Sequence, residues 1–138
     1  MIIVDTGPLV ALLHADDRQH ERCLNWYDTA RGPLIVPQTV AVEVAYFVAQ
    51  RCGPAVEADF VRSLGPDGPF ELAALRPTDM ARVAELVEQY ADFPLGTVDA
   101  SVIALAERLN ITTVATLDVR HFAAVRPRHV DAFTLQPA

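Results

Sequence analysis

The sequence predicts a single α/β domain in which helices flank a central parallel sheet. Short apolar segments, each too brief for a helix, alternate along the chain with longer segments of helical periodicity, and such alternation favours parallel strands. The 138 residues suffice for one hydrophobic core, and 51 % of them are hydrophobic against 21 % charged, which is typical of a globular domain. No repeat, low-complexity tract or linker divides the sequence. We therefore expect residues 1–138 to form one domain.

Five segments have the length and composition of buried strands. In chain order they are Met1–Val4, Leu34–Val36, Phe70–Leu75, Thr112–Leu117 and Ala132–Leu135. The third is the least regular, because Pro69 precedes it and Glu71 interrupts its apolar character. The fourth is rich in β-branched residues, which favour extended backbone. The last is expected at the edge of the sheet.

Six segments between these strands have helical periodicity, namely 7–14, 18–30, 38–52, 53–64, 78–91 and 97–109. Proline in a first turn marks two helix starts, Pro8 and Pro54, and Thr97 is expected to be an N-cap. Four helices have a face expected to point to the core. These faces are Cys23, Leu24 and Tyr27; Val40, Val44, Phe47 and Val48; Val56, Phe60 and Leu64; and Met80, Val83, Val87 and Tyr90.

The net charge of −7 constrains the partners of the protein. An acidic surface repels phosphates, which argues against a nucleic-acid partner. That argument weakens where clustered carboxylates hold divalent cations, which reverse the local sign of the charge. All eleven basic residues are arginine, from which we draw no conclusion about function.

Other features of the sequence indicate a cytoplasmic protein. The two cysteines, Cys23 and Cys52, form no CxxC motif, which argues against a zinc site or a disulfide framework. No apolar run approaches the ~18 residues of a membrane span. No basic leader precedes Asp5, so we expect no signal peptide.

Four acidic residues are expected to meet at one edge of the sheet. In right-handed βαβ units, strand ends and the first turns of helices lie at the carboxyl edge, where open α/β sheets bind ligands. Asp5 and Asp118 end the first and fourth strands, and Glu43 and Asp99 lie near the starts of two helices; the four are Asp5, Glu43, Asp99 and Asp118.

Glu43 is the most informative of the four. It lies three residues after Val40 and four before Phe47, so we expect it to point with the apolar face. An inward carboxylate costs several kcal/mol, roughly, unless it is paired or metal-bound. Asp99 similarly shares a face with Val102 and Ile103.

Each acid also has a purely structural interpretation. Asp5 and Asp118 can cap helices, Asp99 can interact with a helix dipole, and Glu43 can pair with an arginine. Their convergence makes coincidence the weaker account. Because clustered carboxylates raise one another's pKa, hard cations such as Mg²⁺ or Mn²⁺ are the expected counter-charge. The chemistry that follows is metal-assisted hydrolysis of a phosphodiester.

These residues resemble the motifs of a known family. The N-terminal Ile3-Val4-Asp5-Thr6, the helix acid Glu43, the run from Asp99 to Leu109 and the run from Thr116 to Phe122 are similar to a PIN-domain ribonuclease, in particular to VapC-type toxins of bacterial toxin–antitoxin pairs. The resemblance covers almost the whole chain, with the motifs in the order and spacing of the family.

The resemblance implies an α/β/α sandwich around a parallel sheet, Mg²⁺- or Mn²⁺-dependent endoribonuclease activity with one or two ions, and frequently a homodimer. It places the catalytic, metal-binding acids at Asp5, Glu43, Asp99 and Asp118, and supporting hydroxyls at Thr6 and Thr116. Some members have a further acid where this chain has Gly96; Asp92 is the nearest acid upstream and a weaker supporting candidate. The family also implies a cognate antitoxin that can send a basic side chain into the acidic pocket.

The RNA-binding surface is less evident from the sequence. Four basic residues near the C-terminus are candidates for phosphate contacts, namely Arg120, His121, Arg126 and Arg128.

Two other functions stay open at this stage. One is a phosphatase or phosphotransfer domain, although glycine at position 7 and the absence of lysine argue against it. The other is a catalytically silent binding module, which requires the acids to be scattered or paired with arginines.

Overall fold

Five parallel strands form one sheet in the computed structural model, which describes residues 1–137. They are β1 (Ile2–Val4), β2 (Leu34–Pro37), β3 (Phe70–Ala73), β4 (Thr113–Ala115) and β5 (Thr134–Gln136), in the spatial order β3-β2-β1-β4-β5. β1 is central, and Ile3 pairs with Ile35 of β2 and with Val114 of β4. The parallel sheet is as predicted, with the last strand at its edge.

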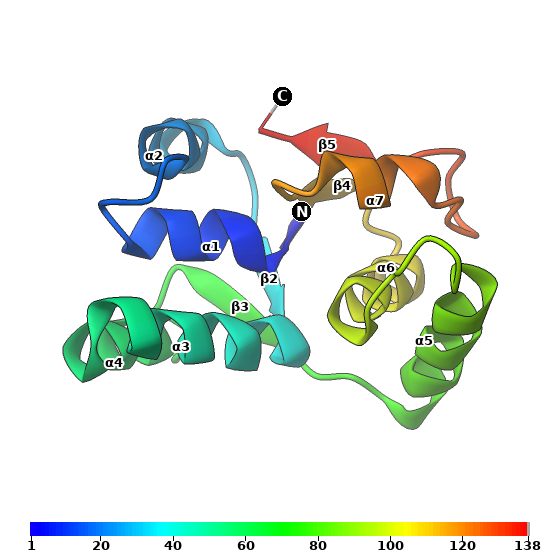
Figure 1. Cartoon of the computed structure of the whole chain (residues 1–138), viewed down its shortest axis with the longest axis horizontal. Helices are drawn as coiled ribbons and strands as arrows, with labels where there is room; N and C mark the ends of the chain where they lie inside the picture. The colour runs from blue at the N-terminus through cyan, green and yellow to red at the C-terminus, as the bar shows by residue number, and fades with distance from the viewer. Residues whose placement is uncertain (138) are drawn as a thin grey trace.

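Seven helices cover this sheet. They are α1 (Thr6–Leu13), α2 (His20–Thr29), α3 (Gln38–Cys52), α4 (Pro54–Ser63), α5 (Pro77–Gln89), α6 (Thr97–Leu109) and α7 (Val119–Ala124). In Figure 1, α1–α4 lie on the left and α5–α7 on the right. The strand order explains this grouping. The chain moves outward from β1 to β3, then crosses back to β4 and β5, and right-handed connections place the helices of the two halves on opposite faces.

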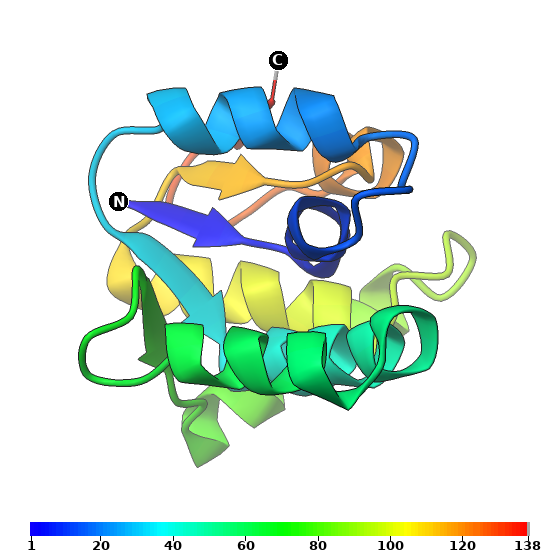
Figure 2. The same cartoon turned by 90° about the vertical axis from the view of Figure 1, so that its left-hand side faces the viewer.

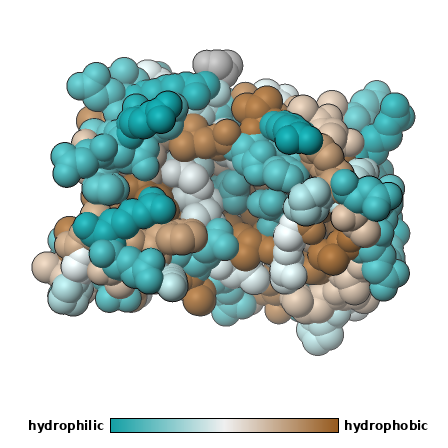
Figure 3. All heavy atoms as spheres, viewed as in Figure 1, coloured by the Kyte–Doolittle hydropathy of each residue, from teal (hydrophilic) through white to brown (hydrophobic). Residues whose placement is uncertain are grey.

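The strand arrows in Figure 2 point the same way, so the carboxyl ends of the strands meet at one edge of the sheet. Figure 1 looks onto this edge. Figure 3, in the same view, shows hydrophilic residues interspersed with several separate apolar patches. Within residues 1–137, none of the helices has the length and continuous apolar character needed to cross a lipid bilayer.

Helix α6 contains a long uninterrupted run of buried residues. All seven residues from Ala100 to Ala106 are buried, on every side of the helix. Its three alanines and Ser101 are small, which allows neighbouring elements to pack closely around it. Since Asp99 immediately precedes this run, the position of one predicted site residue is set by a rigid core helix.

Some predicted helix faces and boundaries were wrong. Met80 is 43 % exposed and Leu24 is 41 % exposed, whereas Asp79 and Trp26 take the buried positions. The buried residues of α5 are Asp79, Val83 and Leu86, and an ion pair with Arg108 makes the buried aspartate tolerable there. Thr97 is the first residue of α6, and Gly96 is its N-cap.

Helix α7 was not predicted from the sequence. It has six residues, too few for a helical periodicity to be recognised, and it follows Asp118 directly. Asp118 is its N-cap, with the backbone N–H of His121 donating to the carboxylate at 3.2 Å. The capping interpretation of Asp118 is therefore correct, and it does not remove the residue from the carboxyl edge of the sheet.

Candidate metal centre

The fold brings the four predicted acids to the carboxyl edge of the sheet. Asp5 follows β1, Glu43 lies in the second turn of α3, Asp99 in the first turn of α6, and Asp118 between β4 and α7. Thr116 joins Asp5 to Asp118, and ligand atoms of Asp99 and Asp118 lie within 4.8 Å of each other. The charges of Asp99 and Glu43 act on Asp5, and those of Asp118 and Glu43 act on Asp99.

Asp5 is the buried member of the cluster, with 6 % of its surface exposed. Its backbone N–H donates to the carbonyl oxygen of Ala115 at 2.9 Å, which continues the pairing of β1 with β4. The side chain does not cap α1. Burial, together with the charges of Asp99 and Glu43, raises the pKa of Asp5 to about 7, despite hydrogen bonds to Thr6 and Thr116 that lower it. Burial thus favours the protonated form of this carboxyl, and a cation beside it would favour the ionised form.

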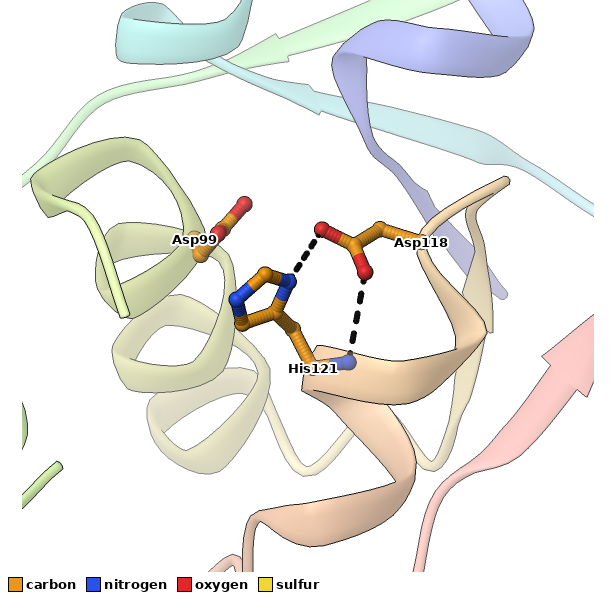
Figure 4. A group of neighbouring side chains, drawn as sticks. All are labelled: Asp99, Asp118 and His121. Carbon is orange, nitrogen blue, oxygen red and sulfur yellow. Dashed lines mark hydrogen bonds and ion pairs between the residues drawn. The ribbon is translucent and has the colours of Figure 1, made fainter. Parts of the chain in front are cut away.

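Asp99, Asp118 and His121 form the tightest group. One ligand atom from each lies within 4.8 Å of the others. Figure 4 shows the His121 ring between the two carboxylates. The ring is hydrogen-bonded through Nδ1 to Oδ2 of Asp118. Burial and the neighbouring charge of Asp118 raise the pKa of Asp99.

Glu43 lies at the solvent border of the buried face of α3. The fully buried residues of this helix are Val40, Val44 and Val48, whereas Glu43 and Phe47 are only partly buried. The prediction that Glu43 points with the apolar face therefore needs correction. The side chain lies beside that face and is only partly buried. Its charge nevertheless raises the pKa of both Asp5 and Asp99.

A pair of hydroxyls connects the helices that carry Glu43 and Asp99. Ser101 is fully buried and donates to the carbonyl oxygen of Val98 at 2.6 Å. Its oxygen lies 2.6 Å from Oγ1 of Thr39, which must therefore be the donor to Ser101. This contact joins the first turn of α3 to the second turn of α6. The sequence analysis did not identify Thr39 or Ser101; a serine among the apolar residues of α6 was the available signal.

The two predicted supporting hydroxyls differ in their surroundings. Thr116, 1 % exposed, donates to Oδ2 of Asp5 at 2.8 Å and accepts from the backbone N–H of Asp118 at 2.9 Å. Thr6 Oγ1 is buried beside Asp5 and has no hydrogen-bond partner within residues 1–137. A buried hydroxyl without a partner is costly unless the site receives another polar group.

These observations fit a divalent cation. The donor set is mostly carboxylate oxygen, which Mg²⁺ and Mn²⁺ prefer. Among the ion pairs of residues 1–137, no arginine is paired with Asp5, Glu43, Asp99 or Asp118. The orphan hydroxyl of Thr6 offers a position for a water molecule.

Other predicted residues lie away from the cluster. Asp92 is exposed in the turn after α5. Arg128 donates from its backbone N–H to Glu107 and from its side chain to Glu85. Glu107 is eight residues after Asp99 on α6, or about 12 Å along the helix, so Arg128 is not at the metal centre. Arg126 is exposed in the loop after α7.

The model of the family described as "PIN domain" matches residues 2–126. The chain belongs to the PIN-domain family. Across 136 residues, 99 % of this chain and all of the relative, this PIN domain is 35 % identical to Ribonuclease VapC26 of Mycobacterium tuberculosis.

Solved structures support the fold of this PIN domain. VapC20 of Mycobacterium tuberculosis, described as a sarcin-ricin loop cleaving toxin, superimposes with a TM-score of 0.77 at 17 % identity, covering 83 % of this chain and 87 % of that chain. VapBC2 from Rickettsia felis, bound to a DNA fragment from its promoter, gives 0.68 at 15 % identity, covering 99 % and 98 %. FitAcB from Neisseria gonorrhoeae gives 0.62 at 20 % identity, covering 86 % and 88 %.

His121 lies inside the acidic group of this PIN domain, with its ring bonded to Asp118. The reason is the short helix α7, which turns position 121 back toward position 118. Predicting a helix directly after Asp118 would have indicated this geometry, because such a helix brings residues 118 and 121 together. The contact of His121 with RNA stays a prediction.

Proposed function

We propose that the acidic cluster is the active site of an Mg²⁺- or Mn²⁺-dependent endoribonuclease, and that the protein is the toxin of a VapBC-type toxin–antitoxin pair acting in the cytoplasm. The observation that carries the proposal is the gathering of four carboxylates from four separate elements without a compensating arginine. Full-length similarity to Ribonuclease VapC26 supports RNA as the substrate.

In this proposal, Asp5, Glu43, Asp99 and Asp118 supply oxygen ligands for one or two ions. A bound divalent ion supplies a counter-charge for the phosphate and a water of lowered pKa. Thr116 holds the Asp5 carboxylate and the Asp118 backbone in fixed positions. Thr6 offers a hydroxyl to a water in the site. No general-base histidine is required, and His121 instead orients the Asp118 carboxylate.

The net charge of −7 makes the rest of the surface unfavourable for RNA, so substrate binding depends on the cations and on nearby arginines. Arg120 and Arg126 are the exposed arginines closest in the chain to Asp118. We propose that they contact phosphates that flank the scissile bond. Asp92 and Arg128 are not part of this proposal.

The cognate partner is proposed to be a VapB-like antitoxin. Two of the similar structures, VapBC2 and FitAcB, are toxin–antitoxin assemblies. An apolar groove reaches the acidic cluster in this chain; its lining includes Val42, Tyr46, Phe47, Leu75 and Val98, with Glu43 at one border. Val42 and Tyr46 are 72 % and 52 % exposed, which is unusual for such side chains without a partner. We also propose that the toxin forms a homodimer.

The two alternative functions are less well supported. A phosphotransfer mechanism needs an accessible carboxylate nucleophile, whereas Asp5 is 6 % exposed. A silent binding module predicts acids that are scattered or neutralised by arginines, and the cluster in residues 1–137 has neither property.

The test is cleavage of structured RNAs by the wild-type protein and by Asp5→Asn and Asp99→Asn, with and without Mn²⁺. Each substitution keeps the shape of the side chain but removes a charged ligand. We expect the rate of Mn²⁺-dependent cleavage to fall by roughly a hundredfold or more while the circular-dichroism spectrum is retained. Asp59→Asn is the control, because Asp59 is exposed on α4 in an ion pair with Arg62. Cleavage that persists in both site variants would reject the proposal.

A further inference from the structure

Phe93 lies beside the metal centre, although nothing in the sequence marked it as functional. It belongs to the loop between α5 and α6 and is partly buried. Its ring centroid is 4.9 Å from that of His121, and the two rings are inclined at 59°. His121 is in turn bonded to Asp118. One side chain therefore separates the Phe93 ring from the acidic cluster.

Arg120 lies over the same ring, with its Cζ atom 5.1 Å from the ring centroid. Arg120 is exposed, and the structure pairs it with no carboxylate among the described residues. Other arginines behave differently: Arg82 and Arg108 are bonded to carboxylates. The guanidinium of Arg120 is thus held on an aromatic ring, with its N–H groups available, two residues after a proposed metal ligand.

This arrangement matches the chemistry of an unpaired nucleotide. Single-stranded RNA is bound by stacking its bases on aromatic rings or guanidinium planes while arginine N–H groups donate to phosphate oxygens. Phe93 and Arg120 together offer both kinds of contact. A ring alone offers only a hydrophobic contact, and an arginine alone is a solvated charge. The two together beside a phosphodiesterase site match the base and the phosphate of a nucleotide.

We propose that Phe93 and Arg120 form a subsite for the unpaired nucleobase next to the scissile phosphate. The inference rests on the proposed ribonuclease function and adds a substrate requirement to it. The base stacks on the Arg120–Phe93 pair, and His121 fixes the pair relative to the metal centre. The subsite requires a base to be present, with little preference for its identity, because every base has a face that can stack.

The experiment uses the full-length protein and a short single-stranded RNA that contains one cleavage site mapped with the wild type in Mn²⁺. Abasic nucleotides are placed singly at the two positions on each side of the scissile bond. We expect one abasic position to lower kcat/KM of the wild type by roughly ten- to a hundredfold. Phe93→Leu, which keeps apolar volume but lacks the ring, is expected to lower kcat/KM on the intact RNA by a similar factor.

The decisive measurement combines the two changes. If the base stacks on the pair, Phe93→Leu loses no further activity on the abasic RNA. If the two losses multiply at every position, or if Phe93→Leu cleaves the intact RNA as fast as the wild type, the subsite is rejected. Failure of the proposed function has a different signature, since the wild type would then show no Mn²⁺-dependent cleavage of any RNA.

A matched control is available in the chain. Arg51 lies over Phe47 at the same 5.1 Å, at the far end of α3. Arg120→Ala is expected to lower kcat/KM on the intact RNA, as Phe93→Leu does, whereas Arg51→Ala is expected to leave the abasic profile unchanged. Equal losses in the two arginine variants would overturn the proposal. Phe93→Trp keeps a stacking surface and is expected to retain kcat/KM. Its added fluorescence should be quenched by the intact RNA and not by the abasic one; equal quenching by both would contradict stacking.

Discussion

Thr116 joins the carboxylate of Asp5 to the backbone of Asp118 through a single hydroxyl. It donates to Asp5 and accepts from the backbone N–H of Asp118, so both ends of the proposed site depend on one oxygen atom. The hydroxyl is fully buried between β1 and β4, where solvent cannot replace it. Groups that orient metal ligands in this way commonly affect activity as strongly as some ligands do.

We predict that Thr116→Val lowers the rate of Mn²⁺-dependent RNA cleavage by roughly ten- to a hundredfold. Valine fills the same volume but leaves the Asp118 N–H without a partner and frees the Asp5 carboxylate. Thr116→Ser keeps the hydroxyl and should restore most of the activity. Steady-state cleavage assays across Mn²⁺ concentrations measure both effects. Equal losses in the serine and valine variants would show that packing, not the hydroxyl, is what matters.

Two ion pairs between α5 and α6 fix the position of α6, the helix that carries Asp99. Arg82 donates to both carboxylate oxygens of Glu107, at 2.8 and 3.0 Å, near the end of α6. Asp79, 4 % exposed, accepts from Nε of Arg108 at 2.9 Å and from the backbone N–H of Arg76 at 2.8 Å. Burial alone would raise the pKa of Asp79, but the Arg108 and Arg76 hydrogen bonds lower it below its usual range.

Because the native pKa of Asp79 is depressed, its contribution to stability is complete above the ordinary carboxyl pKa and is lost as the pH falls through the native value. At pH 7 we predict that Asp79→Ala lowers the free energy of unfolding by about 3 kcal/mol, since it leaves a partly buried Arg108 without its partner. Asp59→Ala, which breaks an exposed pair, should cost less than about 1 kcal/mol. Urea denaturation distinguishes the two, and similar losses would contradict the assignment.

For the whole molecule, the acidic cluster lowers the free energy of unfolding of the metal-free protein once these carboxyl groups ionise. Burial raises the pKa of Asp5 from 3.8 to about 7, and that of Asp99 is also raised. The metal-free native state therefore binds these protons more tightly than the unfolded chain does. Stability from Asp5 is greatest below the unfolded pKa and decreases as the pH rises through about 7.

We predict that, in EDTA, the wild type loses on the order of a few kcal/mol of unfolding free energy between pH 5 and pH 8 relative to Asp5→Asn. Asparagine cannot ionise and should remove this part of the pH dependence. At pH 8, Mn²⁺ should stabilise the wild type by mass action and stabilise Asp5→Asn much less. Urea denaturation at the two pH values provides the measurement. Parallel pH profiles for the two proteins would show that Asp5 is not a destabilised acid.

The sequence alone determined the class of fold and the identity of the acidic residues. Strand segments such as Ile2–Val4 and helices such as Gln38–Cys52 follow from local periodicity and end signals, which short-range physics sets. Asp5 and Asp118 could be placed at one edge because parallel strands share a direction. Helix α7 was missed because six residues contain less than two turns of periodicity.

Only the tertiary structure decided which neighbours surround those acids. The burial of Asp79 in place of Met80 depends on Arg108, the position of His121 depends on α7, and the contact between Phe93 and Arg120 joins the α5–α6 loop to α7. Such contacts depend on distances between residues far apart in the chain, which periodicity does not encode. Local backbone preferences thus determine which segments form helices and strands and where the charged residues lie along them. Long-range packing determines which side chains surround those charged residues.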